Sequence, residues 1–156
     1  MSWALNVSDV DLIENKIRLK PTAKRSNRTV FFDDEAAFIL RRWLRVREGI
    51  NRRKSPALFL STWGLRASWN DICLVVTKAA VRVGLHNPES KRMEDHFSSH
   101  CCRHFFTTHL RWAGMRREFI QELRGDGRKE AIDIYNHIDL KELKEAYLAA
   151  IPQLGI

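Results

Sequence analysis

The chain has 156 residues and lacks the features of a membrane or secreted protein. Its apolar runs stay short of the ~18–20 residues that a membrane-spanning helix needs. The N-terminus has no basic stretch followed by an apolar one, which is the pattern of a signal peptide. We therefore expect a cytoplasmic protein with no membrane partner. The length predicts one domain with its own hydrophobic core over residues 1–156.

Cysteine is scarce and poorly spaced for cross-linking or metal binding. There are three, Cys73, Cys101 and Cys102, and two of them are adjacent. An odd number without C-x-x-C spacing favours reduced, buried thiols over disulfides. Histidines crowd into the same segment, and His100 and His104 are spaced so that they could chelate a metal on one helix face. No second set of ligands stands elsewhere in the sequence, so we predict no metal site.

Charge, by contrast, is one-sided. The chain carries 27 Lys and Arg against 19 Asp and Glu, a formal net charge of +8. A basic balance favours a polyanionic partner and says nothing about the fold. Basic runs in expected loops and helix starts are either solvated surface or contacts to a nucleic-acid backbone. The candidates for such nucleic-acid contacts are Lys24, Arg25, Arg28, Arg52, Arg53 and Arg116.

The hydrophobic pattern predicts a short β region followed by helices. Residues 7–32 contain an alternating stretch, a polar turn and a β-branched and aromatic run, which is typical of a hairpin. Residues 58–60 could add a third strand. Helices are expected from 33 to 49 and at about 67–84, 100–113, 116–124, 128–136 and 140–149. The predicted fold class is mainly α with a small antiparallel β-sheet (α+β).

Two of these helices show apolar stripes at helical spacing, and we expect both stripes to be buried. The stripe of the first helix comprises Phe38, Ile39, Trp43, Leu44 and Val46. Its opposite, solvent-facing side comprises Arg41, Arg42, Arg45 and Arg47. The stripe of the second helix comprises Ile72, Val75, Val76, Ala79, Ala80 and Val83.

His100 and Arg103 are three residues apart and would share one face of the third long helix. Ser98 or Ser99 can cap this helix, which would place His100 in its first turn, where free N–H groups favour an anion. The planar guanidinium of Arg103 matches phosphate oxygens. This spacing allows a phosphate site, although a packed histidine beside a surface arginine is the plainer interpretation. Tyr135 has no local sign of being a nucleophile.

Three ordered blocks resemble the phage-integrase, or tyrosine-recombinase, family. The block H-C-C-R-H-F-F-T-T-H-L at 100–110 resembles the family's L-R-H-x-F-A-T-H-L. The residues at 113–115 and 120–125 resemble its A-G and I-Q-E-L-L-G, and I-Y-N-H at 134–137 resembles its I-Y-T-H. The adjacent cysteines and the R-G-D at 124–126 look closest to integrases of archaea and their viruses. The resemblance covers nearly the whole chain and implies the family's catalytic-domain fold.

The resemblance implies a site-specific recombinase that cuts and rejoins double-stranded DNA through a 3′-phosphotyrosyl intermediate. Tyr135 would be the nucleophile, Arg103 would bind the scissile phosphate, and His100 would assist proton transfer. The family's general-acid lysine in the hairpin turn matches Lys24 best and Lys20 second. No cofactor, metal or small-molecule substrate is implied, because the phosphotyrosyl bond conserves the energy for religation.

Two features depart from the family pattern. Asp126 stands where the family usually has His or Trp, and a carboxylate beside a phosphate needs a proton or a cation such as Arg103 nearby. The family's earlier arginine and its N-terminal DNA-clamping domain have no counterpart here, so we expect a partial catalytic domain. The alternative function is therefore a catalytically inactive DNA-binding remnant or accessory module. The family's C-terminal docking between protomers implies a homotetramer on DNA and a monomer without it.

Overall fold

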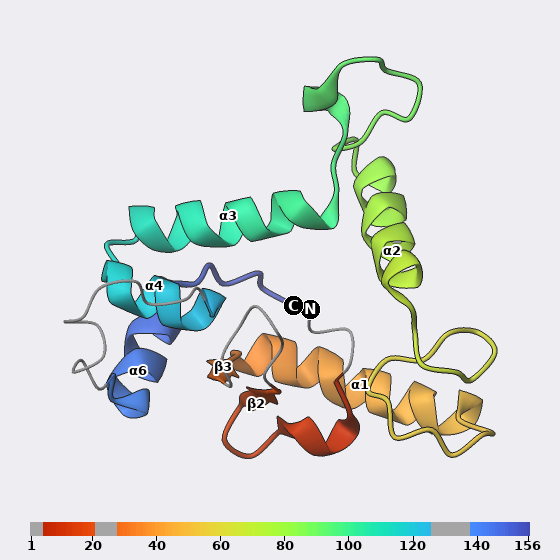
Figure 1. Cartoon of the computed structure of the whole chain (residues 1–156), viewed down its shortest axis with the longest axis horizontal. Helices are drawn as coiled ribbons and strands as arrows, with labels where there is room; N and C mark the ends of the chain where they lie inside the picture. Colours follow the sequence, from red (N-terminus) through yellow and green to blue (C-terminus); the bar gives the residue numbers. More distant parts are fainter. Residues whose placement is uncertain (1–4, 21–27, 126–137) are drawn as a thin grey trace.

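The computed structural model describes residues 5–20, 28–125 and 138–156, and it confirms the predicted fold of helices with a small antiparallel sheet. None of the helices in these ranges combines the length and apolar character needed to cross a membrane. In chain order the elements, shown in Figure 1, are η2 (Val7–Asp9), β1 (Val10–Asp11), β2 (Lys16–Leu19), β3 (Arg28–Phe31), α1 (Asp34–Ile50), α2 (Trp69–Arg82), η3 (Met93–Asp95), α3 (Ser99–Trp112), α4 (Arg117–Arg124) and α6 (Leu140–Ala150).

The sheet has three strands in the order β1-β2-β3, and both pairings are antiparallel. Ile17 of β2 lies opposite Val10 on one side and opposite Val30 on the other. The predicted hairpin of β2 and β3 is confirmed. The prediction of a third strand at residues 58–60 is wrong, because Leu60 makes an isolated bridge there and β1 supplies the third strand.

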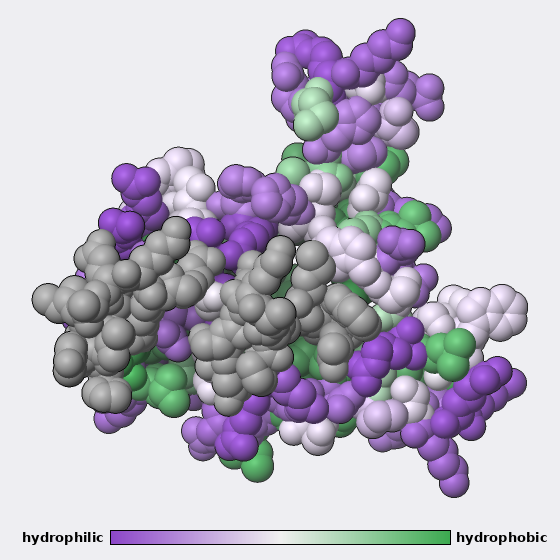
Figure 2. All heavy atoms as spheres, viewed as in Figure 1, coloured by the Kyte–Doolittle hydropathy of each residue, from purple (hydrophilic) through white to green (hydrophobic). Residues whose placement is uncertain are grey.

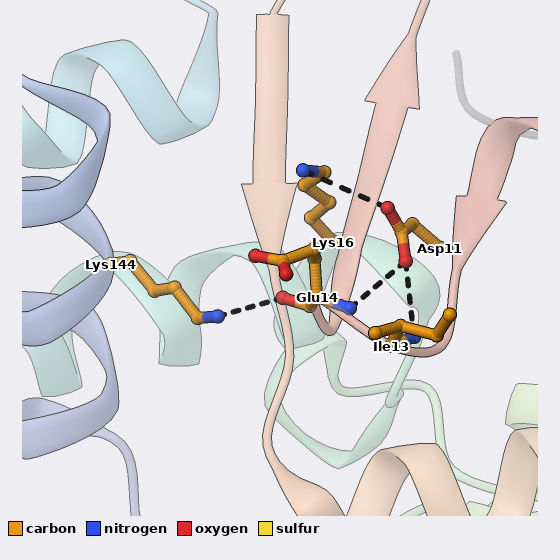
Figure 3. Close-up of polar contacts among 5 residues, drawn as sticks. All are labelled: Asp11, Ile13, Glu14, Lys16 and Lys144. Carbon is orange, nitrogen blue, oxygen red and sulfur yellow. Dashed lines mark hydrogen bonds and ion pairs between the residues drawn. The ribbon is translucent and has the colours of Figure 1, made fainter.

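The turn between β1 and β2 holds the C-terminal helix to the sheet (Figure 3). Oδ1 of Asp11 accepts hydrogen bonds from the N–H groups of Ile13, at 3.0 Å, and Glu14, at 2.9 Å. These bonds, the Glu14 N–H first, lower the pKa of Asp11, and Lys16 lies 3.7 Å from its other oxygen. Lys144 of α6 donates to the carbonyl of Glu14 at 2.7 Å. The turn is therefore ordered by its own aspartate and tied to α6 by one lysine.

A first hydrophobic core joins β3, α3, α4 and α6. It contains Phe31, Leu110, Phe119 and Leu143, of which the last three are almost completely buried. Burying a side chain of this size stabilises the fold by about 1.5–3 kcal/mol. Because these four elements share one core, each holds the others in a fixed relative position.

A second core lies under α1, around Leu5, Leu19 and Leu58, with Leu44 of α1 packed against it. Arg47 is also buried, which contradicts its predicted place on the solvent face. Its guanidinium donates to the carbonyls of Ala57, at 2.8 Å, and Ser55. A buried arginine is stable here because these carbonyls satisfy its N–H groups.

The predicted apolar stripe of α1 is wrong in part, because Phe38, Ile39 and Val46 are exposed. The buried face of α1 instead contains Ala37, Leu44 and Arg47, which lie on the same side of a helix with 3.6 residues per turn. Trp43, which was predicted to be buried, is half-buried, and its Nε1 donates to the carbonyl of Leu58 at 2.8 Å.

Helix α2 stands apart from both cores and meets the start of α3, as Figure 1 shows. Its N-cap Ser68 was predicted and is confirmed. Its predicted buried stripe is largely wrong, because Val75 and Val83 are 68% and 67% exposed and only Ala80 is fully buried. Since α2 crosses the end of α3 and does not lie along it, most of its surface faces outward.

Candidate active site

The N-terminus of α3 has the local structure predicted from the sequence. Ser98 caps the helix, and its Oγ accepts a hydrogen bond from the N–H of His100 at 3.3 Å. No acidic residue stands in the first turn. The positive end of the helix dipole is therefore left without a neutralising carboxylate of its own, which suits an anion.

One face of α3 runs from the first core out to solvent. Leu110 is buried, Phe106 packs against the core, Arg103 is half-buried and His100 is exposed. The shared face of His100 and Arg103, predicted from their spacing, follows from this helix. Oγ1 of Thr107 donates a hydrogen bond to the carbonyl of Arg103 at 3.0 Å. Arg103 thus stands at the edge of the core, one turn below the open helix end.

His100 has a second histidine as its immediate partner. Nε2 of His104 lies 3.0 Å from Nε2 of His100, and the two rings meet edge to face with centroids 4.6 Å apart. The i, i+4 spacing of the two histidines predicts that their side chains are close together. In the sequence analysis we interpreted this spacing only as a possible metal chelate. The described residues contain no group of three or more potential ligands placed to hold a metal ion.

Arg28 begins β3 and reaches the end of α4. Its Nε donates to the carbonyl of Leu123 at 3.1 Å, and its guanidinium lies against Gly125, the left-handed C-cap of that helix. A cation at the C-terminal end of a helix is favourable, because the last carbonyls carry partial negative charge. The contact joins the start of β3 to the segment that precedes Asp126.

The other basic candidates in the described residues are on the surface. Arg52 and Arg53 are exposed in the turn that follows α1. Arg116 is exposed at the start of α4, where its guanidinium lies 3.3 Å from Glu142 and 4.0 Å from the Phe119 ring centroid. Lys20, the second candidate for the catalytic lysine, lies 3.6 Å from Asp9.

Four predicted site residues, Lys24, Arg25, Asp126 and Tyr135, lie outside the described residues, as does the helix expected at about 128–136. The remaining tyrosine, Tyr147, packs against the first core. Burial, with a smaller contribution from the charge of Asp33, raises the pKa of Tyr147. Its contacts with the first core make Tyr147 a packing residue.

The expectation of buried cysteines is wrong for Cys102, which is exposed. The inward face of α3 passes through positions 103, 106 and 110, so position 102 turns outward. Cys73 and Cys101 are half-buried. Cys73 links α2 to α3, with its Sγ 3.6 Å from Oγ of Ser99.

The loop between α2 and α3 projects from the molecule and is covered with hydrophilic side chains (Figure 2). A hydrogen bond joins the two ends of this loop, because Nδ1 of His86 accepts from the N–H of Phe97 at 2.9 Å. The loop carries Lys91 and Arg92 together with Glu89, Glu94 and Asp95, and Arg92 pairs with Glu94. Its mixed charge sets it apart from the basic runs.

Comparison with known sequences identifies relatives of the chain. The phage integrase family model matches residues 3–142. The tyrosine recombinase XerC of Actinobacillus pleuropneumoniae is 33% identical over 149 residues, which are 96% of this chain and 45% of that protein. XerC of Corynebacterium glutamicum is 31% identical, with the same two coverages. The chain therefore spans less than half the length of these relatives.

Comparison with solved structures gives the same fold. The crystal structure of XerA recombinase superposes with a TM-score of 0.69 at 24% identity, covering 97% of this chain and 52% of XerA. The Tn1549 transposon integrase in complex with transposon right end DNA gives a TM-score of 0.63 at 18% identity, covering 92% of this chain and 51% of the integrase. The chain belongs to the phage integrase family and has the fold of a tyrosine-recombinase catalytic domain.

Proposed function

We propose that this chain supplies the catalytic chemistry of a site-specific DNA recombinase. Its partner is double-stranded DNA in the cytoplasm, on which four copies assemble. The observation that carries the proposal is the start of α3, where His100 and Arg103 stand on one face of a helix end without a carboxylate. Family membership and the DNA-bound state of a structural neighbour, the Tn1549 integrase, support the same partner.

In the proposed reaction the hydroxyl oxygen of Tyr135 attacks the scissile phosphorus. A Tyr135–phosphate bond forms while the bond from phosphorus to the 5′-oxygen breaks, which leaves a 3′-phosphotyrosyl link and a 5′-hydroxyl. His100 assists removal of the tyrosine proton, and Lys24 gives a proton to the leaving oxygen. Attack by another 5′-hydroxyl reverses the step. The energy of the phosphodiester stays in the protein link, so the reaction consumes no nucleotide.

Arg103 has the role of stabilising the charge that develops on the phosphate oxygens. Its half-buried position on a helix that is fixed in the core supports this role, because a preorganised cation loses little freedom in the transition state. The contact of Arg28 with Gly125 supports a common site as well. Arg28 follows the segment that contains Lys24 in the sequence, and Gly125 precedes the segment that contains Asp126 and Tyr135. The contact therefore brings the neighbours of these two segments together.

The test is covalent capture. The chain is incubated with a pool of nicked duplexes of randomised sequence, from which the short fragment that carries the new 5′-hydroxyl diffuses away, and the denatured protein is examined for attached DNA. We expect an adduct that maps to Tyr135 and disappears in Tyr135→Phe. Tyr147→Phe is the matched control, and it should leave the adduct unchanged because Tyr147 packs against the first core. Equal signals from the wild-type chain and Tyr135→Phe would contradict the proposal.

A further inference from the structure

The hydrogen bond between His100 and His104 carries a consequence for how His100 works. We propose that His104 is a positioning residue that holds the ring of His100 by its Nε2 atom, so that the chemistry of His100 is carried out by its Nδ1 atom. The inference rests on the proposed function for the role of His100. It rests on geometry alone for the pair: two Nε2 atoms 3.0 Å apart, with the rings nearly perpendicular at 87°.

A bond between two imidazole nitrogens needs one N–H donor and one bare acceptor. When both rings are neutral, one must therefore carry its proton on Nε2 and the other on Nδ1. The tautomer of His104 then decides the chemistry of the free nitrogen of His100. If His104 donates, Nδ1 of His100 is an N–H donor suited to a phosphate oxygen. If His104 accepts, Nδ1 of His100 is bare and suited to the tyrosine proton.

His100 needs a partner because both histidine rings are exposed. An exposed side chain exchanges between rotamers on the picosecond to nanosecond scale. The helix backbone fixes the relation of positions 100 and 104, and the hydrogen bond removes rotamers in which the rings part. His104 therefore supplies His100 with an orientation that the core, which ends below Arg103, does not supply.

Another histidine of α3 provides the matched control. His109 is half-buried and stacks on Phe105, with ring centroids 5.3 Å apart and an interplanar angle of 23°. It lies on the same helix as His104 and belongs to a different cluster. His104→Phe and His109→Phe therefore make the same chemical change, and only the first removes a nitrogen that bonds His100.

The first experiment reads the tautomers by nitrogen NMR of the histidine-labelled chain at about pH 8.5, above the ordinary histidine pKa of about 6.5. We expect one ring of the pair to be protonated on Nδ1 and the other on Nε2. His104→Phe should return His100 to the averaged mixture of an exposed ring, and His109→Phe should leave it unchanged. Two rings both protonated on Nε2 in the wild-type chain would leave no acceptor and would overturn the proposal, whether or not the chain cleaves DNA.

The second experiment measures the rate of adduct formation on the captured duplexes. His104→Phe should slow it about 10- to 100-fold, the cost of a displaced catalytic group, with unchanged DNA affinity. His104→Gln, which can still hydrogen-bond, should recover part of the rate, and His109→Phe should react like the wild type. A wild-type rate in His104→Phe would overturn the positioning role. If instead Tyr135→Phe forms the adduct as well as the wild type, the proposed function fails and the tautomers alone decide whether the pair exists.

Discussion

Arg28 and Leu123 are 95 residues apart in the sequence, yet Nε of the arginine donates to the carbonyl of the leucine at 3.1 Å. Arg28 was predicted as a contact to the DNA backbone, and its DNA contact stays a prediction. What the structure adds is an internal role. The guanidinium lies at the C-terminal end of α4 and contacts Gly125. A substitution of either residue should therefore disturb the position of the other.

Gly125→Ala should lower the free energy of unfolding more than an alanine substitution at another glycine with positive φ and no close neighbour. Gly125 has φ of +65°, and an added Cβ would stand 2.4 Å from Nη1 of Arg28. The left-handed conformation alone costs a residue with a Cβ about 1–2 kcal/mol. Moving the arginine tip is easy in itself but breaks the bond to Leu123, which is worth about 0.5–1.5 kcal/mol. Urea unfolding should show the sum of both losses.

Gly114→Ala is the control for this prediction. Its φ is +78°, and an added Cβ would meet nothing within 4 Å, so only the backbone cost applies. In an Arg28→Ala background the two glycine substitutions should cost the same. If Gly125→Ala remains the worse of the two without Arg28, the contact between Arg28 and Gly125 is not the cause.

The exposed arginines after α1 should contribute to DNA affinity through salt-dependent contacts. Arg52→Ala with Arg53→Ala should weaken binding to duplexes of any sequence, because phosphate contacts carry no sequence information. Each lost phosphate contact should reduce the steepness of log K against log salt by about 0.9. Fluorescence anisotropy at several KCl concentrations measures both quantities.

Lys91→Ala with Arg92→Ala removes the same number of positive charges and serves as the control. These residues stand in the projecting loop with three carboxylates, and Arg92 is paired with Glu94. We expect little change in the salt slope. Equal effects of the two double variants would mean that net charge, and not the position of Arg52 and Arg53, governs binding.

Helix α6 should behave as part of the core. Leu143 is completely buried, whereas Leu140, one turn earlier on the same helix, is 51% exposed. Leu143→Ala should therefore lower the free energy of unfolding by about 2–5 kcal/mol. Leu140→Ala should change it by no more than about 0.5 kcal/mol. Urea denaturation of both variants distinguishes them, and similar stabilities would mean that α6 is not packed as described.

The elements of this fold follow from local signals in the sequence, and their packing follows only in part. Ser68 and Ser98 mark helix starts because a hydroxyl can satisfy free N–H groups, a purely local effect. The burial of Arg47 and the exposure of Val75 depend on which neighbours a helix meets. Carbonyls of residues 55 and 57 accept from Arg47, while α2 crosses only the end of α3. The hydrophobic periodicity of a single helix therefore cannot predict the burial of Arg47 or the exposure of Val75.

The candidate site shows the same division. The shared face of His100 and Arg103 is fixed by helix geometry and could be predicted from spacing. The hydrogen bond between His100 and His104 had a signal in the i, i+4 spacing, but spacing does not distinguish a bond from a chelate. The contact of Arg28 with Leu123 had no signal, since it joins a strand to a helix end far along the chain.

The C-terminal residues should leave α1 when the solution is made acidic. The carboxylate of Glu35 accepts hydrogen bonds from the N–H groups of Leu154, at 2.7 Å, Gly155, at 2.6 Å, and Ile156, at 3.1 Å. These bonds, the Leu154 N–H first, lower the pKa of Glu35 from its ordinary value of 4.5. A carboxyl with a lowered pKa stabilises the docked state fully above the ordinary pKa and loses that contribution as the pH falls through the lowered one.

Amide NMR spectra recorded from neutral pH down to acid should therefore show the signals of residues 154–156 moving together, with a midpoint below 4.5. Glu35→Gln keeps an acceptor oxygen without the charge, so docking should be weaker and should not respond to pH in that range. The amide of Phe119, buried in the first core, reports whether the whole fold is lost at the same pH. A midpoint at or above 4.5, or the same titration in Glu35→Gln, would show that another group holds the C-terminal residues.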